Sequence, residues 1–219
     1  MKKNKVSWSS SRALTSRALH QALSRILPRY ARGIVVDLGC GNKPYQNYVR
    51  AKKYIGIDKQ GGDLKADVLD LPLKNSYADT VISTQVLEHV IDPRQLFKES
   101  YRILKPGGYL ILTAPMNWPI HDVSKDYWRF TEFGLVHLAK ESGFKVIDCQ
   151  PLDGFISVVW QMMAMLIERP TYHHGFFRTI LKLIIKPLFQ LIQPGIYWLD
   201  RLKPIKGLTM NNVLIAQKK

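Results

Sequence analysis

The middle of the chain alternates between short apolar runs rich in β-branched residues and amphipathic helical patterns. This alternation begins with GIVVDLGCG at residue 33 and ends with FKVIDCQ at residue 150. It is typical of βαβ units, in which helices bury both faces of a parallel sheet. The pattern therefore predicts an α/β, Rossmann-like fold across residues 33–150.

Capping signals agree with this segmentation, and they set one late segment apart. Thr131 is placed to cap one helix, and Asp92-Pro93 opens another. The final run, NNVLIAQKK at residues 211–219, predicts one more strand. About 60 residues separate it from FKVIDCQ, far more than a hairpin needs. We therefore interpret residues 151–210 as a mainly helical insertion before the last strand of the core.

The net charge of +15 is concentrated at the two ends of the chain. Residues 1–32 carry eight Lys/Arg and no Asp/Glu, and residues 151–210 carry seven against three, whereas residues 33–150 carry fifteen against fourteen. Apolar residues recur at helical spacing within residues 11–30, which predicts a basic N-terminal helix. Basic ends of this kind favour phosphate-bearing partners, either nucleic acid or anionic lipid.

Cysteine usage and hydropathy restrict the class of protein further. Cys40 and Cys149 form no disulfide framework and no metal-ligand spacing, so we expect a reduced, cytosolic protein without a metal site. Arginines interrupt the N-terminal segment, which consequently lacks the apolar region of a signal peptide. No uncharged apolar run reaches the roughly 18 residues of a membrane-spanning helix.

Glycines and acids follow the first predicted strands in a suggestive order. VVDLGCG follows a predicted strand and precedes a predicted helical region, whose first N–H groups could bind a carboxylate or phosphate. Its Gly39 and Gly41 allow a sharp turn and a close approach of backbone to a ligand. The third glycine of the dinucleotide fingerprint and the Gly-Lys-Ser/Thr of a P-loop are absent. Asp37 lies two residues before Gly39, and its charge suits a cationic cofactor better than a pyrophosphate.

Two further acids extend this pattern along the next part of the chain. Asp58 ends the second predicted strand about 20 residues later, where α/β nucleotide sites bind the ribose hydroxyls. Asp67, followed by Val68, is placed to accept a hydrogen bond from an adenine amino group. A single acid at a strand end is more often a turn residue, so the order of the whole set carries the prediction.

These motifs resemble the class I S-adenosylmethionine-dependent methyltransferases of the type 11 family. VVDLGCG is similar to the family's first motif, GID to its ribose acid, ADVLDLPL to its adenine motif, and DTVISTQVLEHVIDPRQLFKESYRILKPGGYLILTAP to its fourth and fifth strands. The resemblance implies a seven-stranded sheet with an antiparallel last strand. It also implies S-adenosyl-L-methionine as cofactor and S-adenosyl-L-homocysteine as product. The cofactor contacts that it implies are Asp37, Gly39, Cys40 and Gly41 at the methionine moiety, Asp58 at the ribose, Asp67 and Val68 at the adenine, and Gln85 beside the cofactor.

The segment after the fourth predicted strand bears on the acceptor atom. It reads STQVLEHV and lacks the Asn/Asp-Pro-Pro-aromatic motif of relatives that methylate planar amino groups, which favours an oxygen acceptor. A hydroxyl acceptor benefits from a general base, and histidine is the usual one near neutral pH. His121, just after the fifth strand, is the leading candidate, and His89 is the second. A structural hydrogen bond for His121, and packing or capping for His89, are the alternatives.

The loop that begins with His121 also offers groups for an acceptor. HDVSKDYWRFTEFG loosely resembles a segment of uncharacterised relatives from glycan- and lipid-biosynthesis settings. Asp126, Tyr127, Trp128 and Arg129 combine an acid, two aromatic rings and a fork-shaped cation, and they are predicted to bind an anionic or sugar-like acceptor. Alternatively, Trp128 and Phe130 only anchor the loop to the core.

Within the insertion, RTILKLIIKPLFQLIQP gathers its polar residues on one side of a helix. At 100° per residue, five polar side chains share about one third of the circumference: Arg178, Lys182, Lys186, Gln190 and Gln193. A wide apolar face opposite a narrow basic one suits a helix lying in a bilayer interface. We therefore predict contact with an anionic membrane through residues 155–199 and the basic N-terminus, with a lid or a homodimer interface as alternatives.

These observations favour a methyltransferase that acts on an oxygen of a small or lipid-linked acceptor of glycan or quinone type. Its expected location is cytoplasmic and peripheral, on the inner face of a membrane. An RNA methyltransferase is one alternative, motivated by the basic ends. The neutral centre and the lack of an added RNA-binding module disfavour nucleic acid as a partner. The other alternative is a non-catalytic, cofactor-binding interaction protein.

Overall fold

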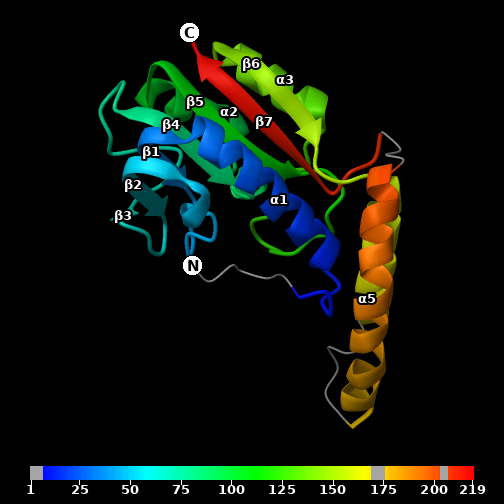
Figure 1. Cartoon of the computed structure of the whole chain (residues 1–219). Coiled ribbons are helices and arrows are strands. Elements are labelled where there is room, and N and C mark those ends of the chain that lie inside the picture. Colours follow the sequence, from blue (N-terminus) through cyan, green and yellow to red (C-terminus); the bar gives the residue numbers. More distant parts are fainter. Residues whose placement is uncertain (1–6, 169–175, 203–206) are drawn as a thin grey trace. The chain divides into compact units, whose positions relative to one another are not determined.

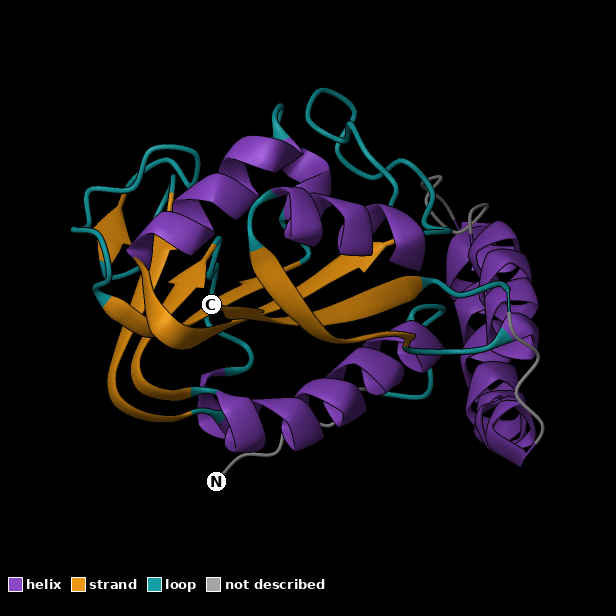
Figure 2. Ribbon diagram, turned by 90° about the horizontal axis from the view of Figure 1, so that it is seen from above, coloured by secondary structure: helices purple, strands orange, loops and turns teal. Residues whose placement is uncertain are grey.

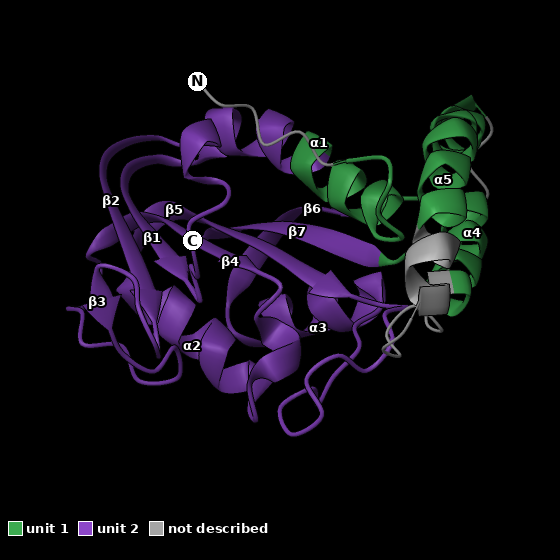
Figure 3. Cartoon of the chain, turned by 90° about the horizontal axis from the view of Figure 1, so that it is seen from below, with its two compact units in different colours: residues 1–21, 152–210 green, residues 22–151, 211–219 purple. Residues whose placement is uncertain are grey.

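A computed structural model describes residues 7–168, 176–202 and 207–219. It divides the chain into two compact units, coloured separately in Figure 3. The core unit comprises residues 22–151 and 211–219, and the tail unit comprises residues 1–21 and 152–210. The boundary lies inside helix α1 (Ala13–Tyr30). The sequence placed this boundary at residue 32 instead, at the end of the basic helix.

The core unit is built on one seven-stranded sheet (Figure 1). Its strands are β1 (Arg32–Leu38), β2 (Arg50–Asp58), β3 (Leu64–Lys65), β4 (Ala78–Thr84), β5 (Leu104–Pro115), β6 (Phe144–Pro151) and β7 (Asn211–Lys218). Their order is β3-β2-β1-β4-β5-β7-β6, and β7 runs antiparallel to both of its neighbours. The predicted fold class is confirmed, including the antiparallel last strand.

Helices cover the sheet on both faces, as Figure 2 shows. Helices α2 (Pro93–Ile103) and α3 (Glu132–Glu141) lie on one face, and residues 22–30 of α1 lie on the other. The Asp92 carboxylate accepts hydrogen bonds from two backbone N–H groups at the start of α2, and Thr131 Oγ1 accepts one at the start of α3. Both predicted caps are confirmed, because each satisfies N–H groups that a helix leaves unpaired.

The crossover from β1 to β2 departs from the expected alternation. The sequence predicts a helical region after the glycine turn, but the structure has only a short 3₁₀ turn, Gln46–Tyr48. Eleven residues separate Leu38 from Arg50, and Pro44 lies among them, which leaves no room for a covering helix. The described loop between β1 and β2 therefore has no α-helix N-terminus beside the glycines. Any N–H groups that bind a ligand there must come from the loop backbone.

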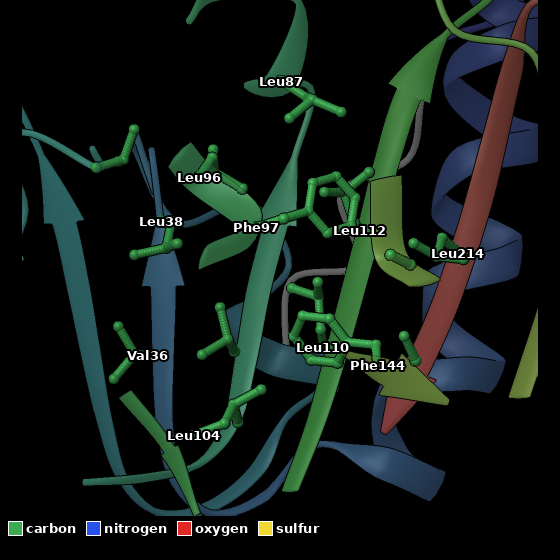
Figure 4. Packing of buried hydrophobic residues seen from close by; sticks show 14 of the residues in the cluster. Val36, Leu38, Leu87, Leu96, Phe97, Leu104, Leu110, Leu112, Phe144 and Leu214 are labelled. Atoms are coloured by element: carbon green, nitrogen blue, oxygen red, sulfur yellow. The ribbon is translucent and has the colours of Figure 1, made fainter. Parts of the chain in front are cut away.

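Large apolar side chains fix the sheet to α2 and α3 (Figure 4). Leu96 and Phe97 of α2 lie in one buried cluster with Leu110 and Leu112 of β5. The Phe97 ring meets Phe144 edge to face, with centroids 6.4 Å apart. Each such side chain contributes about 1.5–3 kcal/mol when it is fully buried. The carboxyl ends of the strands are therefore held on a rigid support, from which the loops of the site extend.

Besides the first half of α1, the tail unit contains the helices α4 (Phe155–Glu168) and α5 (Phe176–Leu202), which pack against each other. Ala164 of α4 forms a small apolar cluster with Ile185 and Phe189 of α5, and Trp160 packs beside it. Helix α5 continues through both of its prolines. Among the described residues, neither helix is long and apolar enough to cross a membrane.

Polar side chains occupy much of the interior of the tail unit. Gln193 is fully buried, and its Nε2 donates to the carbonyl oxygens of Trp8 and Ser10, at 2.9 and 3.0 Å. Gln161, also fully buried, accepts a hydrogen bond from Thr15 Oγ1 at 3.0 Å. These bonds offset the cost of burying amide groups. They also tie the N-terminal segment to α4 and α5.

The predicted polar face of α5 is therefore only partly exposed. Lys186 and Gln190 are exposed, but Gln193 is buried, which corrects the expectation that it faces solvent. The side chains of Arg178 and Lys182 lie outside the described part of the chain.

Candidate active site

The first part of the site lies where β1 ends. Asp37, near the carboxyl end of β1, is 3% exposed, and its Oδ2 accepts a hydrogen bond from the Tyr54 hydroxyl of β2. Its Oδ1 has no hydrogen-bond partner among the described residues. Burial raises the pKa of Asp37 to about 7, although the Tyr54 hydrogen bond and the Lys43 charge both act to lower it. A buried carboxylate with one unpaired oxygen is suited to a cationic ligand group.

The two glycines of the turn serve different purposes. Gly39 has a φ of 64°, and a Cβ added there would clash with the methyl groups of Val86. Gly41 has a φ of 46°, but a Cβ added there would meet nothing within 4 Å. Gly39 is therefore required for close packing against the segment after β4, whereas Gly41 borders open space. Cys40 between them is buried, and burial raises the pKa of its thiol to about 11.

Asp58 closes this edge from the end of β2. Its Oδ2 accepts a hydrogen bond from the Gly41 N–H at 3.1 Å, and its Oδ1 accepts one from the Gln60 N–H at 2.9 Å. The predicted ribose acid thus lies directly against the glycine turn. Asp67 lies farther along the same edge, where its Oδ2 pairs with Lys59 Nζ at 2.9 Å and its Oδ1 accepts the Leu69 N–H at 3.0 Å.

Three residues that the sequence analysis missed organise this part of the site. Tyr54 binds Asp37, as described above, and Lys43 Nζ bonds Asp63 Oδ1 at 2.5 Å. Asp63 Oδ2 also accepts the Gly56 N–H at 2.7 Å, which fixes the turn after β2. The approach is tight, because a Cβ on Gly56 would lie 2.6 Å from Cys40 Sγ. No sequence motif indicates these contacts, because they join residues that are far apart in the sequence and that come together only when β1 and β2 pair.

The segment after β4 forms the next wall. Gln85 has a φ of 56°, and its backbone N–H and side-chain amide both donate to Thr113 of β5, at 3.0 and 3.2 Å. These two bonds hold a left-handed backbone conformation that costs a non-glycine residue about 1–2 kcal/mol. A short 3₁₀ turn, Leu87–His89, follows.

Val68, the predicted adenine contact, is 5% exposed and belongs to the main apolar cluster.

Both predicted histidines meet at this edge of the sheet. His89 Nε2 and His121 Nε2 are 3.1 Å apart, although 32 residues separate them in sequence. Glu88, which no sequence motif singles out, lies beside them with Oε1 3.8 Å from His89 Nε2. Glu88 is 1% exposed, and burial raises the pKa of its carboxyl to about 7.

The loop after β5 is organised by an ion pair. Arg129 binds both carboxylate oxygens of Asp126, at 2.5 and 2.7 Å, and donates to the carbonyl oxygen of Trp118 at 2.7 Å. Asp126 Oδ2 in turn accepts the His121 N–H and lies 3.2 Å from His121 Nδ1. Arg129 holds the pKa of Asp126 well below its usual range. The ion pair therefore fixes where His121 lies.

The predicted acceptor-binding residues thus have defined places. The charged groups of Asp126 and Arg129 bond to each other, and the Trp128 indole N–H donates to the Val90 carbonyl at 3.0 Å. Trp128 does anchor the loop to the core. Tyr127 and Trp128 are 49% and 43% exposed, so both rings still offer surface to a ligand. Acceptor binding by these residues stays a prediction.

A separate hollow opens at the opposite, amino-terminal edge of the sheet. It encloses about 670 Å³ and is lined by residues that include Arg29, Asp79 and Lys105. Lys105 Nζ already bonds Asp79 at 2.8 Å. None of the predicted site residues lines this hollow. The acids, glycines and histidines described above all lie at the carboxyl edge, where open α/β sheets bind ligands.

Comparison with known proteins agrees with this geometry. Residues 36–112 match the family model for a methyltransferase domain of type 11. A probable S-adenosylmethionine-dependent methyltransferase of Mycolicibacterium smegmatis is 27% identical over 145 residues, which cover 57% of this chain and 56% of the relative. The chloroplastic 2-methyl-6-phytyl-1,4-hydroquinone methyltransferase of Arabidopsis thaliana is 33% identical over 87 residues, 37% of this chain and 25% of the relative.

Solved structures share the fold. The crystal structure of an S-adenosylmethionine-dependent methyltransferase from Thermotoga maritima aligns with a TM-score of 0.58 and 20% identity, over 95% of this chain and 91% of that one. Residues 36–112 therefore match a methyltransferase domain, as the sequence motifs predicted, and the solved structure shows that the chain shares the fold of S-adenosylmethionine-dependent methyltransferases. The chain spans just over half the length of the mycobacterial relative.

The residues present fit the cofactor of this family. The unpaired, buried Asp37 oxygen is chemically suited to a positively charged group such as those of the methionine moiety, and the Gly41 position borders open space. Asp58 lies against the Gly41 turn, and its contact with the ribose hydroxyls stays a prediction. When bound, S-adenosylmethionine supplies an activated methyl group on a sulfonium.

Proposed function

We propose that the protein transfers a methyl group from S-adenosylmethionine to an oxygen of a lipid-associated acceptor at the surface of an anionic membrane. The acceptor class is a quinol or a lipid-linked glycan. When bound, S-adenosylmethionine would supply the methyl group and leave as S-adenosylhomocysteine, while the protein would align the acceptor oxygen with that methyl group. The acceptor's proton passes to the histidine pair.

The exposed apolar surface of the tail unit carries this proposal. Twelve large apolar side chains of α4 and α5 are at least 38% exposed, whereas Gln161, Gln193 and Asp200 are buried. This is the reverse of the usual distribution in a water-soluble helix pair. On α5 the exposed apolar residues, from Leu183 to Leu202, fall within an arc of about 160° at 100° per residue. A continuous stripe of this kind is suited to insertion into a bilayer interface.

The charges of the tail unit favour anionic lipid over a neutral surface. Neither acidic side chain described in this unit, Asp153 or Asp200, is exposed, whereas Lys186 and Arg201 are. Basic residues near an anionic surface contribute roughly 1 kcal/mol each. Among the relatives, the Arabidopsis enzyme is named for a hydroquinone with a phytyl chain, which is the type of acceptor that such a surface would serve.

The histidine pair supports oxygen as the methylated atom. His121 Nδ1 faces the ionised Asp126 carboxylate at 3.2 Å, which stabilises the imidazolium that forms when the ring takes a proton. The His121 and His89 side chains are 31% and 28% exposed, so an acceptor can reach them from solvent. A hydroxyl must lose its proton during transfer, and this pair gives the proton a place to go.

Vesicle flotation tests the membrane part of the proposal. The full chain is mixed with vesicles of phosphatidylcholine, alone or with phosphatidylglycerol, and floated at two salt concentrations. Leu191, 79% exposed, is changed to Glu, and the neighbouring exposed Gln190 is changed to Glu as a matched control. Burying Leu191 contributes about 1.5 kcal/mol, so Leu191→Glu should weaken partitioning by tenfold or more beyond the control.

Transfer of radiolabel from methyl-labelled cofactor tests the acceptor. Lipid extracts, soluble metabolites and RNA are offered in parallel, and labelled products are treated with base and acid to separate ethers from esters. Label in the lipid fraction, lost in His121→Gln, supports the proposal. Label in RNA, or no flotation of the unaltered chain on anionic vesicles, overturns the lipid assignment and leaves α4 and α5 as a protein-binding or dimer surface.

A further inference from the structure

The cluster of Glu88, His89 and His121 has the arrangement of a metal site. Among the residues that the structure describes, one ligand atom from each lies within 4.8 Å of the other two. Glu88 and His89 belong to the 3₁₀ turn after β4, and His121 begins the loop after β5. From this geometry we propose that the three side chains bind one divalent first-row metal ion.

Hydrogen bonds on the far side of each ring set the tautomers. His89 Nδ1 is 2.8 Å from the carbonyl oxygen of Lys125, which only accepts, so this nitrogen carries the proton. His121 Nδ1 lies 3.3 Å from the Pro119 carbonyl oxygen and 3.2 Å from Asp126 Oδ2, which also accept. In the neutral rings both Nε2 atoms therefore present lone pairs. At 3.1 Å these lone pairs repel each other unless a cation lies between them.

The outer bonds are those that metal-binding histidines make. A ligating histidine usually donates its second ring N–H to a carbonyl or carboxylate, which fixes the ring and its tautomer. His89 uses a carbonyl in this way, and His121 uses Asp126, whose position Arg129 holds. Both rings are therefore oriented from behind toward the same point.

The distances and the third group agree with a metal ion. Bonds of about 2.0–2.1 Å from zinc to two nitrogens place those nitrogens roughly 3.0–3.4 Å apart, and the observed separation is 3.1 Å. Glu88 is 1% exposed, and its Oε2 has no hydrogen-bond partner among the described residues. A buried carboxylate oxygen without a partner is costly, and a bound cation would compensate that cost.

The ligand set indicates which metals fit. Two imidazoles and one carboxylate suit zinc, iron(II), cobalt or manganese rather than calcium or magnesium, which prefer oxygen alone. Three protein ligands leave coordination positions open, as in catalytic sites. If the proposed function holds, a metal ion held by these three residues would act as a Lewis acid toward the acceptor oxygen, whose proton would pass to solvent water. In the metal-loaded protein the histidines then act as ligands, and their role as base belongs to the metal-free state.

Cobalt(II) is the probe for the site. The full chain without a histidine tag is stripped with chelator and titrated with Co²⁺, and visible d–d absorption and calorimetry are recorded with Mg²⁺ in parallel. One equivalent of Co²⁺ should bind, and Zn²⁺ should displace it. His121→Gln should abolish the band, whereas His137→Gln, which changes a solvent-exposed side chain of α3, should not. Asp126→Asn, which loosens the orienting bond, should weaken binding about 10–100-fold.

Each outcome decides a separate question. No Co²⁺ band, or a band unchanged in both His121→Gln and His89→Gln, overturns the metal site and leaves a proton shared by the pair. Circular dichroism of each variant shows whether it folds, and His121→Gln is informative even if Glu88→Gln unfolds. Metal binding without any methyl transfer upholds the site and counts against the proposed function. Methyl transfer that is insensitive to chelator upholds the function and removes the metal's role in it.

Discussion

Gly39 and Gly41 form a matched pair that tests the geometry of the cofactor turn. Both have positive φ, 64° and 46°, so replacing either by Ala costs about 1–2 kcal/mol of backbone strain. Only Gly39 faces a neighbour, because its added Cβ would overlap the Val86 side chain. The overlap lies well inside the ordinary contact distance of about 3.5–4.0 Å, and overpacking of this kind costs about 1–3 kcal/mol more.

Gly39→Ala should therefore lower the free energy of unfolding by about 2–5 kcal/mol, against about 1–2 kcal/mol for Gly41→Ala. At roughly 2–4 °C per kcal/mol for a chain of this size, thermal unfolding separates the two variants. Adding Val86→Ala to Gly39→Ala should restore the overpacking part, and a double-mutant cycle measures it. Gly41→Ala should instead weaken S-adenosylmethionine binding in calorimetry, because its Cβ enters the space left for the ligand. Equal loss of stability in both single variants, with no rescue by Val86→Ala, would refute the reasoning.

Three further changes test other parts of the structure. Asp58→Ala should weaken S-adenosylmethionine binding about 10–100-fold in calorimetry, because it removes a hydrogen-bonding charged group worth about 1.5–3 kcal/mol; an unchanged Kd would argue against the ribose role. Asp200→Ala should destabilise the tail unit by about 1–3 kcal/mol, because the Asp200 carboxylate accepts hydrogen bonds from two backbone N–H groups at the start of α4. Limited proteolysis of this variant should cut within residues 152–210, and Asp200→Asn should retain part of the protection. Tyr54→Phe should raise the pKa of Asp37 further, because it removes a hydrogen bond to the ionised carboxylate. The Asp37 carboxyl carbon chemical shift, followed by NMR against pH, measures this pKa, and an unchanged value would mean that the bond is unimportant.

Much of the core and part of the site could be predicted from sequence because local chemistry specifies them. β-Branched runs identify buried strands wherever their neighbours are, and the caps at Asp92 and Thr131 act within three residues of themselves. The order of Asp37, Gly39 and Asp58 predicts one edge of the sheet because parallel strands all end there. These signals are short-range, and the structure keeps each of them.

The remaining features depend on contacts that strand pairing and loop closure create. Nothing in LEHV indicates that Glu88 is buried or that His121 will meet His89, because that meeting depends on the Asp126–Arg129 ion pair. The expected helix between β1 and β2 is missing because the loop is too short to hold it. Hydrophobic periodicity alone gives no information about that length. Gln193 was expected on a solvated face, but it is buried because the N-terminal segment offers carbonyl oxygens to its amide.

The buried Asp37 carboxyl links cofactor binding to pH. Its pKa of about 7 lies well above the roughly 3.9 of an unfolded aspartate, so between about pH 4 and 7 the folded protein binds more protons than the unfolded chain. Its contribution to stability is therefore largest below pH 4 and is lost as the pH rises through 7. A cationic cofactor group beside the unpaired oxygen favours the ionised form, so binding below pH 7 must release a proton.

Affinity for S-adenosylmethionine should consequently rise with pH up to about 7 and then level off. Calorimetry at pH 6 in two buffers with different ionisation enthalpies should show proton release, and Asp37→Asn should remove both the release and the pH dependence. S-adenosylhomocysteine keeps the ammonium but lacks the sulfonium, so comparing the two ligands shows which positive group Asp37 faces. A pH-independent Kd with no proton release for either ligand would mean that Asp37 serves only to hold Tyr54, and that the charge of the cofactor is balanced elsewhere.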